Sequence, residues 1–98
     1  MGRVMEDDHH RNLLELYDAI LKLDNKGEVE NFFADLCTPA ELKAMRERWK
    51  VCQLLDRKNL SYRDIQKVTK ASLSTIGRVS RFLKEEKHHG YRAILRKL

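Results

Sequence analysis

The sequence has a single proline and no long run of apolar residues, and these two absences narrow the class of protein. A chain with 42% hydrophobic residues and one proline is typical of a folded helical protein and not of a disordered one. No apolar segment approaches the roughly 20 residues that a membrane-spanning helix needs. The first ten residues, MGRVMEDDHH, lack the apolar core of a signal peptide. We therefore expect a cytoplasmic protein with no membrane partner.

Residues that would indicate an enzyme or a metal site are also missing. Cys37 and Cys52 lack the paired spacing of a zinc site, and two such cysteines fit a reducing compartment better than a disulfide scaffold. In each of the histidine pairs, 9–10 and 88–89, the two adjacent side chains point to different faces of a helix. Neither pair has a further metal ligand at suitable spacing. The chain contains no glycine-rich phosphate loop, nucleophile elbow or zinc-protease helix. We expect no metal, no cofactor and no catalytic residue.

Charge is unevenly distributed along the chain. Residues 1–36 hold four Lys/Arg and nine Asp/Glu, a balance of −5, whereas residues 37–98 hold 16 Lys/Arg and six Asp/Glu, a balance of +10. A concentrated basic charge is expected of a nucleic-acid binder, because cations that neutralise phosphates release counterions. An ordinary solvated surface gives the same count, so the charge needs support from a motif.

Apolar residues that recur every three or four positions predict six helices, within one domain, and no strands. The first helix is expected over residues 9–23 and the second over 28–36, with Gly27 as a left-handed stop between them. Thr38, Pro39 and Glu41 form a start signal for a central helix that runs to about residue 57. The single helical DNA-binding domain, 1–98, divides into dimerisation helices (1–36), a central helix (37–58), a helix-turn-helix (60–84) and a C-terminal helix (88–98), whose helical part is expected over residues 91–98 after Gly90.

Residues 60–84, LSYRDIQKVTKASLSTIGRVSRFLK, have the pattern of a helix-turn-helix. Ser61 and Asp64 are placed as a capping box, residues 69–71 as the turn, and Ser72 as the cap of the second helix. Such a second helix enters the DNA major groove with small side chains near the bases and basic ones near guanines and phosphates. The candidate DNA-binding residues are Tyr62, Arg63, Gln66, Lys67, Lys70, Leu73, Ser74, Thr75, Gly77, Arg78, Arg81 and Lys84.

Apolar stripes are expected to bury one side of each of these two helices. The first stripe consists of Tyr62, Ile65 and Val68, and the second of Leu73, Ile76, Val79, Phe82 and Leu83.

From Leu36 to Lys84 the sequence resembles the Trp repressor family. The matching segments are LCTPAELKAMRERWKVCQLLDRKNLS, YRDI and TIGRVSRFLK, of which Leu-x-Thr-Pro and Thr-Ile-x-Arg-x-Ser are the most specific parts. The ending Gly90-Tyr91, with Arg78-Val79 and Arg81, is similar to the YerC/YecD branch of Trp repressor-like proteins. The resemblance implies an all-α, six-helix fold with a helix-turn-helix, an intertwined homodimer, and sequence-specific binding of double-stranded DNA by a transcriptional repressor.

In this family a small-molecule corepressor lies between the central helix and the DNA-reading helix. The resemblance assigns the two ligand-holding arginines to Arg48 and Arg78, and a pocket-lining residue of the other subunit to Thr38. The position after Arg78 is glycine in the tryptophan-binding proteins and Val79 here. Because an isopropyl group should crowd an indole ring, we expect any effector to be a molecule other than tryptophan.

Two alternatives stay open on the sequence. Arg48 and Arg78 are equally suited to pair with acidic neighbours, namely Glu47, Asp56 or Glu85. The chain is also compatible with a helical protein-interaction module, such as an adaptor or an accessory to RNA polymerase, because its apolar N-terminal third offers a surface for a foreign chain.

Overall fold

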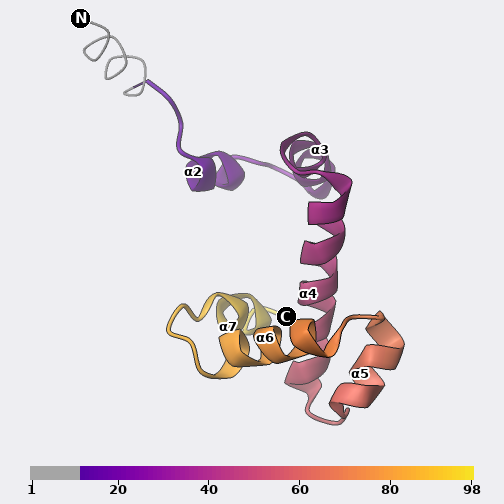
Figure 1. Ribbon diagram of the computed structural model, residues 1–98. Helices are drawn as coiled ribbons and strands as arrows, with labels where there is room; N and C mark the ends of the chain where they lie inside the picture. The colour runs from indigo at the N-terminus through magenta and orange to yellow at the C-terminus, as the bar shows by residue number, and fades with distance from the viewer. Residues whose placement is uncertain (1–11) are drawn as a thin grey trace, which may run out of the picture. The chain divides into compact units, whose positions relative to one another are not determined.

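The computed structural model describes residues 12–98, and this part of the chain is all-helical (Figure 1). The helices are α2 (Leu16–Leu21), α3 (Lys26–Leu36), α4 (Pro39–Arg57), α5 (Tyr62–Thr69), α6 (Leu73–Lys84) and α7 (Gly90–Leu95). The contacts divide the chain into two compact units, one ending at Cys37 and the other spanning Thr38–Leu98. Within residues 12–98, no helix is long and apolar enough to cross a membrane.

Helix α2 is much shorter than the predicted helix over residues 9–23. It begins at Leu16 because the Glu15 carboxylate caps it, accepting a hydrogen bond from the Tyr17 backbone N–H at 3.0 Å. Residues 12–15 form a turn and extended chain, and residues 9–11 lie outside the described residues. Leu13, which lies within the predicted range, is 69% exposed. The periodicity alone therefore did not locate the start of the helix.

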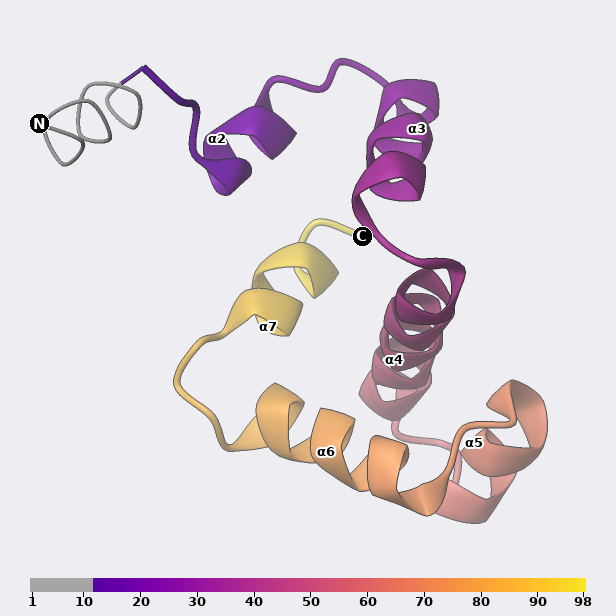
Figure 2. The ribbon, with the colours of Figure 1, turned by 45° about the horizontal axis from the view of Figure 1, so that its top comes forward.

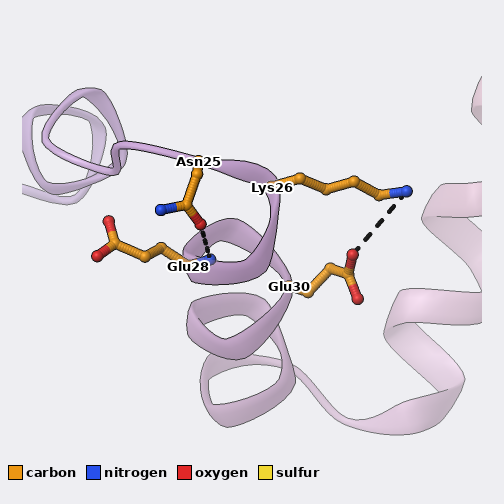
Figure 3. Close-up of polar contacts among 4 residues, drawn as sticks. All are labelled: Asn25, Lys26, Glu28 and Glu30. Carbon is orange, nitrogen blue, oxygen red and sulfur yellow. Dashed lines mark hydrogen bonds and ion pairs between the residues drawn. The ribbon is translucent and has the colours of Figure 1, made fainter.

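Helix α3 begins two residues earlier than predicted, and Gly27 lies in its first turn instead of acting as a left-handed stop. The Asn25 side chain caps the helix by accepting a hydrogen bond from the Glu28 backbone N–H at 2.9 Å (Figure 3). Lys26 and Glu30, which are one turn apart on the helix, form an ion pair at 4.0 Å. The asparagine cap sets the start of the helix, so the glycine adopts an ordinary helical conformation.

The two predicted capping boxes are present in the second unit. At the start of α4, Thr38 Oγ1 accepts a hydrogen bond from Glu41 N–H at 3.1 Å, and the Glu41 carboxylate accepts one from Thr38 N–H at 2.8 Å. Ser61 and Asp64 exchange the same pair of hydrogen bonds at the start of α5, both at 3.1 Å. These local bonds satisfy backbone N–H groups that a helix start otherwise leaves unpaired.

Left-handed residues other than glycine separate the helices of the second unit. Lys58, with φ 62°, ends α4, and Lys70, with φ 64°, ends α5. His89, with φ 56°, precedes α7, which begins at Gly90 and ends at Leu95. The last helix is therefore shifted from the predicted range 91–98, because the break falls one residue earlier than the glycine.

The core of the second unit lies where α4, α5 and α6 meet (Figure 2). Helix α4 contacts both α5 and α6, and α6 also contacts α7, so α4 is the central helix of this unit as predicted. The buried residues are Val51, Cys52, Leu55, Ile65, Ala71, Ile76, Val79 and Leu83.

The predicted apolar stripes are only partly buried. Ile65 is fully buried, whereas Tyr62 is 42% and Val68 61% exposed. On α6, Ile76 is fully buried but Leu73 is 56% exposed. The helices α5 and α6 each bury a narrower face than their apolar spacing suggested, because contacts with α4 and with each other cover only one side.

The capping boxes predict how stability depends on pH. Hydrogen bonds from Thr38 lower the pKa of Glu41 below its ordinary value of 4.5, and those from Ser61 lower the pKa of Asp64 below 3.8. Since both pKa values are lower in the folded chain, the stabilisation is complete above the unfolded values and is lost as pH falls through the folded ones. The double variant Glu41→Gln, Asp64→Asn should therefore lose less stability than the wild type between about pH 5 and pH 2.

Urea unfolding across this pH range measures the effect. Gln and Asn keep a hydrogen-bond acceptor but do not ionise, so they isolate the titration from the loss of the cap. Ser61→Ala removes the side-chain hydrogen bond but keeps the backbone N–H that donates to the Asp64 carboxylate, so it should reduce the Asp64 share of the pH dependence without abolishing it. Identical pH profiles for the wild type and the double variant would contradict this assignment.

Candidate nucleic-acid interface

Helix α6 is buried on one side and open on the other. Its inner side packs into the core of the second unit through Ile76, Val79, Ser80 and Leu83. Thr75 and Phe82 are half-buried at the edges of this side. The outer side is exposed and carries three cations along its length: its residues are Leu73, Ser74, Gly77, Arg78, Arg81 and Lys84.

The start of α6 is fixed by Ser72. The Ser72 hydroxyl accepts a hydrogen bond from Thr75 N–H and donates one to Thr75 Oγ1, both at 3.1 Å. One lone pair of the threonine hydroxyl is therefore used by the cap, while Leu73 and Ser74 stand exposed at the tip of the helix. Of the three candidate DNA-binding residues at the start of α6, Leu73 and Ser74 are more accessible than Thr75.

The turn between α5 and α6 is held by a side chain. The Thr69 hydroxyl donates a hydrogen bond to the Ile65 carbonyl at 2.7 Å and accepts one from Ala71 N–H at 3.1 Å. These bonds bridge the left-handed Lys70, whose side chain is exposed. Ala71, which completes the turn, is fully buried and anchors it in the core.

The outer side of α6 includes one position with spare room. A Cβ atom placed on Gly77 would meet no heavy atom within 4 Å. Gly77 is exposed between the buried Ile76 and the exposed Arg78.

All twelve candidate DNA-binding residues lie on α5, the turn or α6, and none of them belongs to the buried core. On α5, Tyr62, Arg63 and Lys67 are exposed and Gln66 is half-buried. The structure thus brings the residues into one continuous part of the second unit. Their roles toward DNA stay predictions.

The arginines of α6 are partly engaged within the protein. The Arg78 guanidinium lies 4.4 Å from the centroid of the Phe82 ring, and that of Arg81 lies 5.3 Å from it. Arg81 also pairs with Glu86 at 3.5 Å. The His88 ring stacks on Phe82, with centroids 6.0 Å apart. Sequence reasoning had assigned Phe82 to the core and had given His88 and Glu86 no role in positioning these arginines.

A pocket of about 260 Å³ lies between α6 and α7. Two candidate effector residues, Arg78 and Val79, line it. Val79 itself is fully buried, so its isopropyl group belongs to the core as well as to the pocket wall. The other lining residues are Phe82, His88, Gly90 and Tyr91.

The aromatic ring of Tyr91 ties α7 to α4. It stacks on Trp49, with ring centroids 6.4 Å apart and an angle of 25° between the planes. Burial raises the pKa of Tyr91, while the charges of Arg48 and Arg78 act in the opposite direction. The two candidate effector arginines therefore both lie near this tyrosine. Only the pair Gly90-Tyr91 had been singled out in the sequence, as a family mark and not as a contact.

The remaining candidate effector residue, Thr38, lies at the start of α4, where it serves as the cap. It precedes Arg48 by ten residues, about 15 Å along a helix axis, and is not part of the pocket lining. Among residues 12–98 the ion pairs are Lys26–Glu30 and Arg81–Glu86. Neither Arg48 nor Arg78 thus forms an ion pair with the acidic neighbours considered from the sequence.

The cysteine and histidine side chains of the described residues show no sign of a reactive or metal-binding site. Cys37 and Cys52 are free thiols, and burial raises the pKa of Cys52 to about 11, so this thiol stays protonated at neutral pH. Within the described residues, no three His, Cys, Asp or Glu side chains lie close enough together to hold a metal ion. The histidine pair at 9–10 lies outside those residues.

Comparison with known proteins places this architecture in a family. Residues 11–98 match the family model described as Trp repressor protein, and the chain belongs to this family. It is a Trp repressor-like protein of the YerC branch, as the sequence motifs predicted: the uncharacterised protein YerC of Bacillus subtilis (strain 168) is 38% identical over 73 residues, which cover 74% of this chain and 69% of that protein.

Two solved structures share the fold. One is a crystal structure of a candidate Trp repressor from Staphylococcus aureus, and the other is that of a TrpR-like protein from Eubacterium eligens ATCC 27750. Each is 36% identical to this chain and superposes with a TM-score of 0.76 over 83% of it, covering 79% and 81% of the respective chains. The six helices of residues 12–98 therefore have the fold of Trp repressor-like proteins.

The contact between Tyr91 and Trp49 predicts a spectroscopic signature. Trp49 is the single tryptophan of the chain, so its fluorescence reports the packing of α7. Tyr91→Leu should change the Trp49 emission and destabilise the fold by about 0.5–1.5 kcal/mol through the lost aromatic pair. Tyr62→Leu, at a side chain on α5 that is 42% exposed, is the matched control. Equal effects of the two substitutions would refute the role of Tyr91.

Proposed function

We propose that the protein is a homodimeric, sequence-specific DNA-binding transcriptional regulator that acts as a repressor. In this proposal α5, the turn and α6 form a helix-turn-helix, and α6 is the reader helix that enters the major groove. The observation that carries it is the two-sidedness of α6, which buries an apolar side and exposes a tip of small side chains followed by cations. Membership of the Trp repressor family and the charge of +10 on residues 37–98 support it.

The exposed residues divide by the contacts that their chemistry favours. Leu73 suits a thymine methyl group, and Ser74 and Thr75 suit hydrogen bonds to base edges. Gly77 lets the helix backbone approach the groove closely. The phosphate contacts are assigned to the longer polar and basic side chains, namely Tyr62, Arg63, Gln66, Lys67, Lys70 and Lys84.

Arg78 and Arg81 of the reader helix are accessible to DNA and also make contacts within the protein. Both are exposed, yet Arg78 lies against the Phe82 ring and Arg81 pairs with Glu86. We assign both to DNA, and Arg78 also to the effector pocket. Release of Arg81 from Glu86 would then accompany DNA binding.

The first unit supplies the support for a dimer. No residue between 12 and 37 is buried, and α2, α3 and the residues just before α2 expose several large apolar side chains, which a folded chain normally covers. We assign this surface to the twin chain, since one helix-turn-helix offers a small footprint and related motifs bind as dimers. A foreign protein chain is the second candidate occupant. The exposed side chains are Leu13, Leu14, Leu16, Tyr17, Leu21, Val29 and Leu36.

The pocket between α6 and α7 is proposed as the place where an effector other than tryptophan would act. Arg78 provides a guanidinium suited to an anionic group, and Arg48 adds a second positive charge nearby. The Val79 side chain narrows the pocket, and the rings of Phe82, His88 and Tyr91 occupy the space around that side chain. A ligand of this pocket would contact α6 and α7 together and so bias the position of the reader helix.

The DNA-binding proposal predicts a symmetric operator. Selection from a random duplex pool should yield two related half-sites about 34 Å apart, as expected for a two-fold symmetric dimer. In titrations with the selected duplex, Ser74→Ala should relax the preference at one base position of each half-site. Lys70→Gln should leave the preference intact and reduce the slope of log K against log salt by about 0.9 for each phosphate contact that is lost.

Sequence-indifferent binding at every salt concentration would rule out this function. Unsymmetric single sites, together with a monomeric mass in sedimentation, would instead favour the protein-interaction module.

The pocket predicts the response to tryptophan. Because Val79 crowds the position beside Arg78, tryptophan at millimolar concentration should leave the thermal melt of the protein unchanged. A ligand present at 100 times its dissociation constant would add about 2.7 kcal/mol of stability. In the same assay run with a panel of other carboxylates, a true ligand would therefore raise the melting temperature clearly. A stabilising shift with tryptophan would overturn the assignment of Val79.

A further inference from the structure

A second basic surface lies outside the helix-turn-helix, on the central helix. A groove of about 210 Å³ runs between α4 and the end of α5. Lys43, Arg46 and Lys50 line it from α4, together with Glu47, and Thr69 lines it from α5. We call the three cations with Glu47 and Thr69 the α4 groove.

The three cations of the α4 groove are available to a partner. Lys43, Arg46 and Lys50 are all exposed, and none forms an ion pair at 4 Å or less with an acidic residue among residues 12–98. They recur at intervals of three and four, which places them along one face of α4. With Glu47 between them, the groove keeps a net charge of +2.

The spacing of these charges fits a nucleic-acid strand. From Lys43 to Lys50 the α4 axis advances about 10 Å at 1.5 Å per residue. One strand of duplex DNA presents a phosphate about every 3.4 Å of axis. The stripe is therefore long enough to face about three consecutive phosphates.

The α4 groove also lies beside the tip of the reader helix. Thr69 is the last residue of α5, and only the turn separates it from Leu73, the first residue of α6. Four residues of extended chain span at most about 14 Å, which is close to the roughly 12 Å width of the major groove. A phosphate strand that borders the groove entered by α6 thus falls within reach of the long side chains on α4.

We propose that the α4 groove binds the phosphate backbone of the same duplex that α6 reads, which extends the contact beyond the helix-turn-helix. This inference rests on the proposed DNA-binding function and assigns it a further contact surface. Phosphate contacts carry no sequence information of their own, so the surface adds affinity and fixes the register of the protein on its site.

Substitution of Glu47 tests the proposal through a gain in affinity, which a folding defect would not produce. Its carboxylate lies in the α4 groove and would repel an approaching phosphate. Two unit charges about 7 Å apart in water change a binding constant about threefold. Glu47→Gln should therefore bind the selected duplex about threefold more tightly at low salt for each subunit bound, and the gain should shrink as salt rises.

The main experiment compares two variants that each lose three positive charges. Lys43→Gln, Arg46→Gln, Lys50→Gln removes the cations of the α4 groove. Arg92→Gln, Arg96→Gln, Lys97→Gln removes three exposed cations at the C-terminal end of the chain and serves as the control. Fluorescence anisotropy with the selected duplex measures affinity across salt, and circular dichroism confirms that both variants are folded.

The groove variant should reduce the salt slope by about 2 to 3 for each subunit bound and weaken binding more than tenfold at 0.1 M salt. Its ratio of affinities for selected and scrambled duplexes should equal that of the wild type. The control variant should reduce the slope by less than one. Equal effects of the two variants, or no gain from Glu47→Gln, would overturn the proposal.

Failure of this inference is distinguishable from failure of the proposed function. If Lys70→Gln lowers the salt slope and selected duplexes are preferred while the groove variant matches its control, the helix-turn-helix stands and the α4 groove does not bind DNA. If the wild type prefers no sequence and Lys70→Gln has no effect on the salt slope, both proposals fall.

Discussion

The packing of α6 against α4 is the contact on which the rest of the second unit depends. Ile76, Val79 and Leu83 occupy one stripe of α6, and burying this stripe fixes the rotation of the helix about its own axis. The opposite side of α6 is exposed as a consequence, and no interaction of that side is needed to keep it facing solvent. Truncating a fully buried residue such as Ile76 costs about 2–5 kcal/mol in typical cores, and it would also loosen the orientation of the exposed side.

Local hydrogen bonds then set where the neighbouring helices begin and end. Ser61 and Ser72 start α5 and α6, and Thr69 braces the turn between them. The left-handed Lys70 pays a conformational cost that glycine would avoid. The turn is thus held in place by side-chain bonds on both sides of that strained residue and by Ala71 in the core. Position and orientation of α6 are therefore specified separately, the first by caps and the second by packing.

Much of this arrangement was predictable because it is encoded over short distances. The boxes at Thr38 and Ser61 depend on residues three positions apart, and the central helix follows from an uninterrupted apolar period. Gly27 misled the prediction because the nearby Asn25 supplied a competing start signal of equally short range. The contact of Tyr91 with Trp49 was not predictable, since it joins residues 42 positions apart across three connections between helices, and no local pattern indicates which aromatic side chains will meet.

The spare room at Gly77 has a consequence for how such proteins diversify. A larger side chain at this exposed position meets no atom of the fold, and replacing a helical glycine gains stability instead of losing it. A mutation there is therefore tolerated by the scaffold and is felt only by whatever lies against the outer side of the helix. Under the assigned role of α6, a single substitution at this position can change which operator the protein binds. It does so without loss of stability, so the DNA target can evolve while the fold is kept.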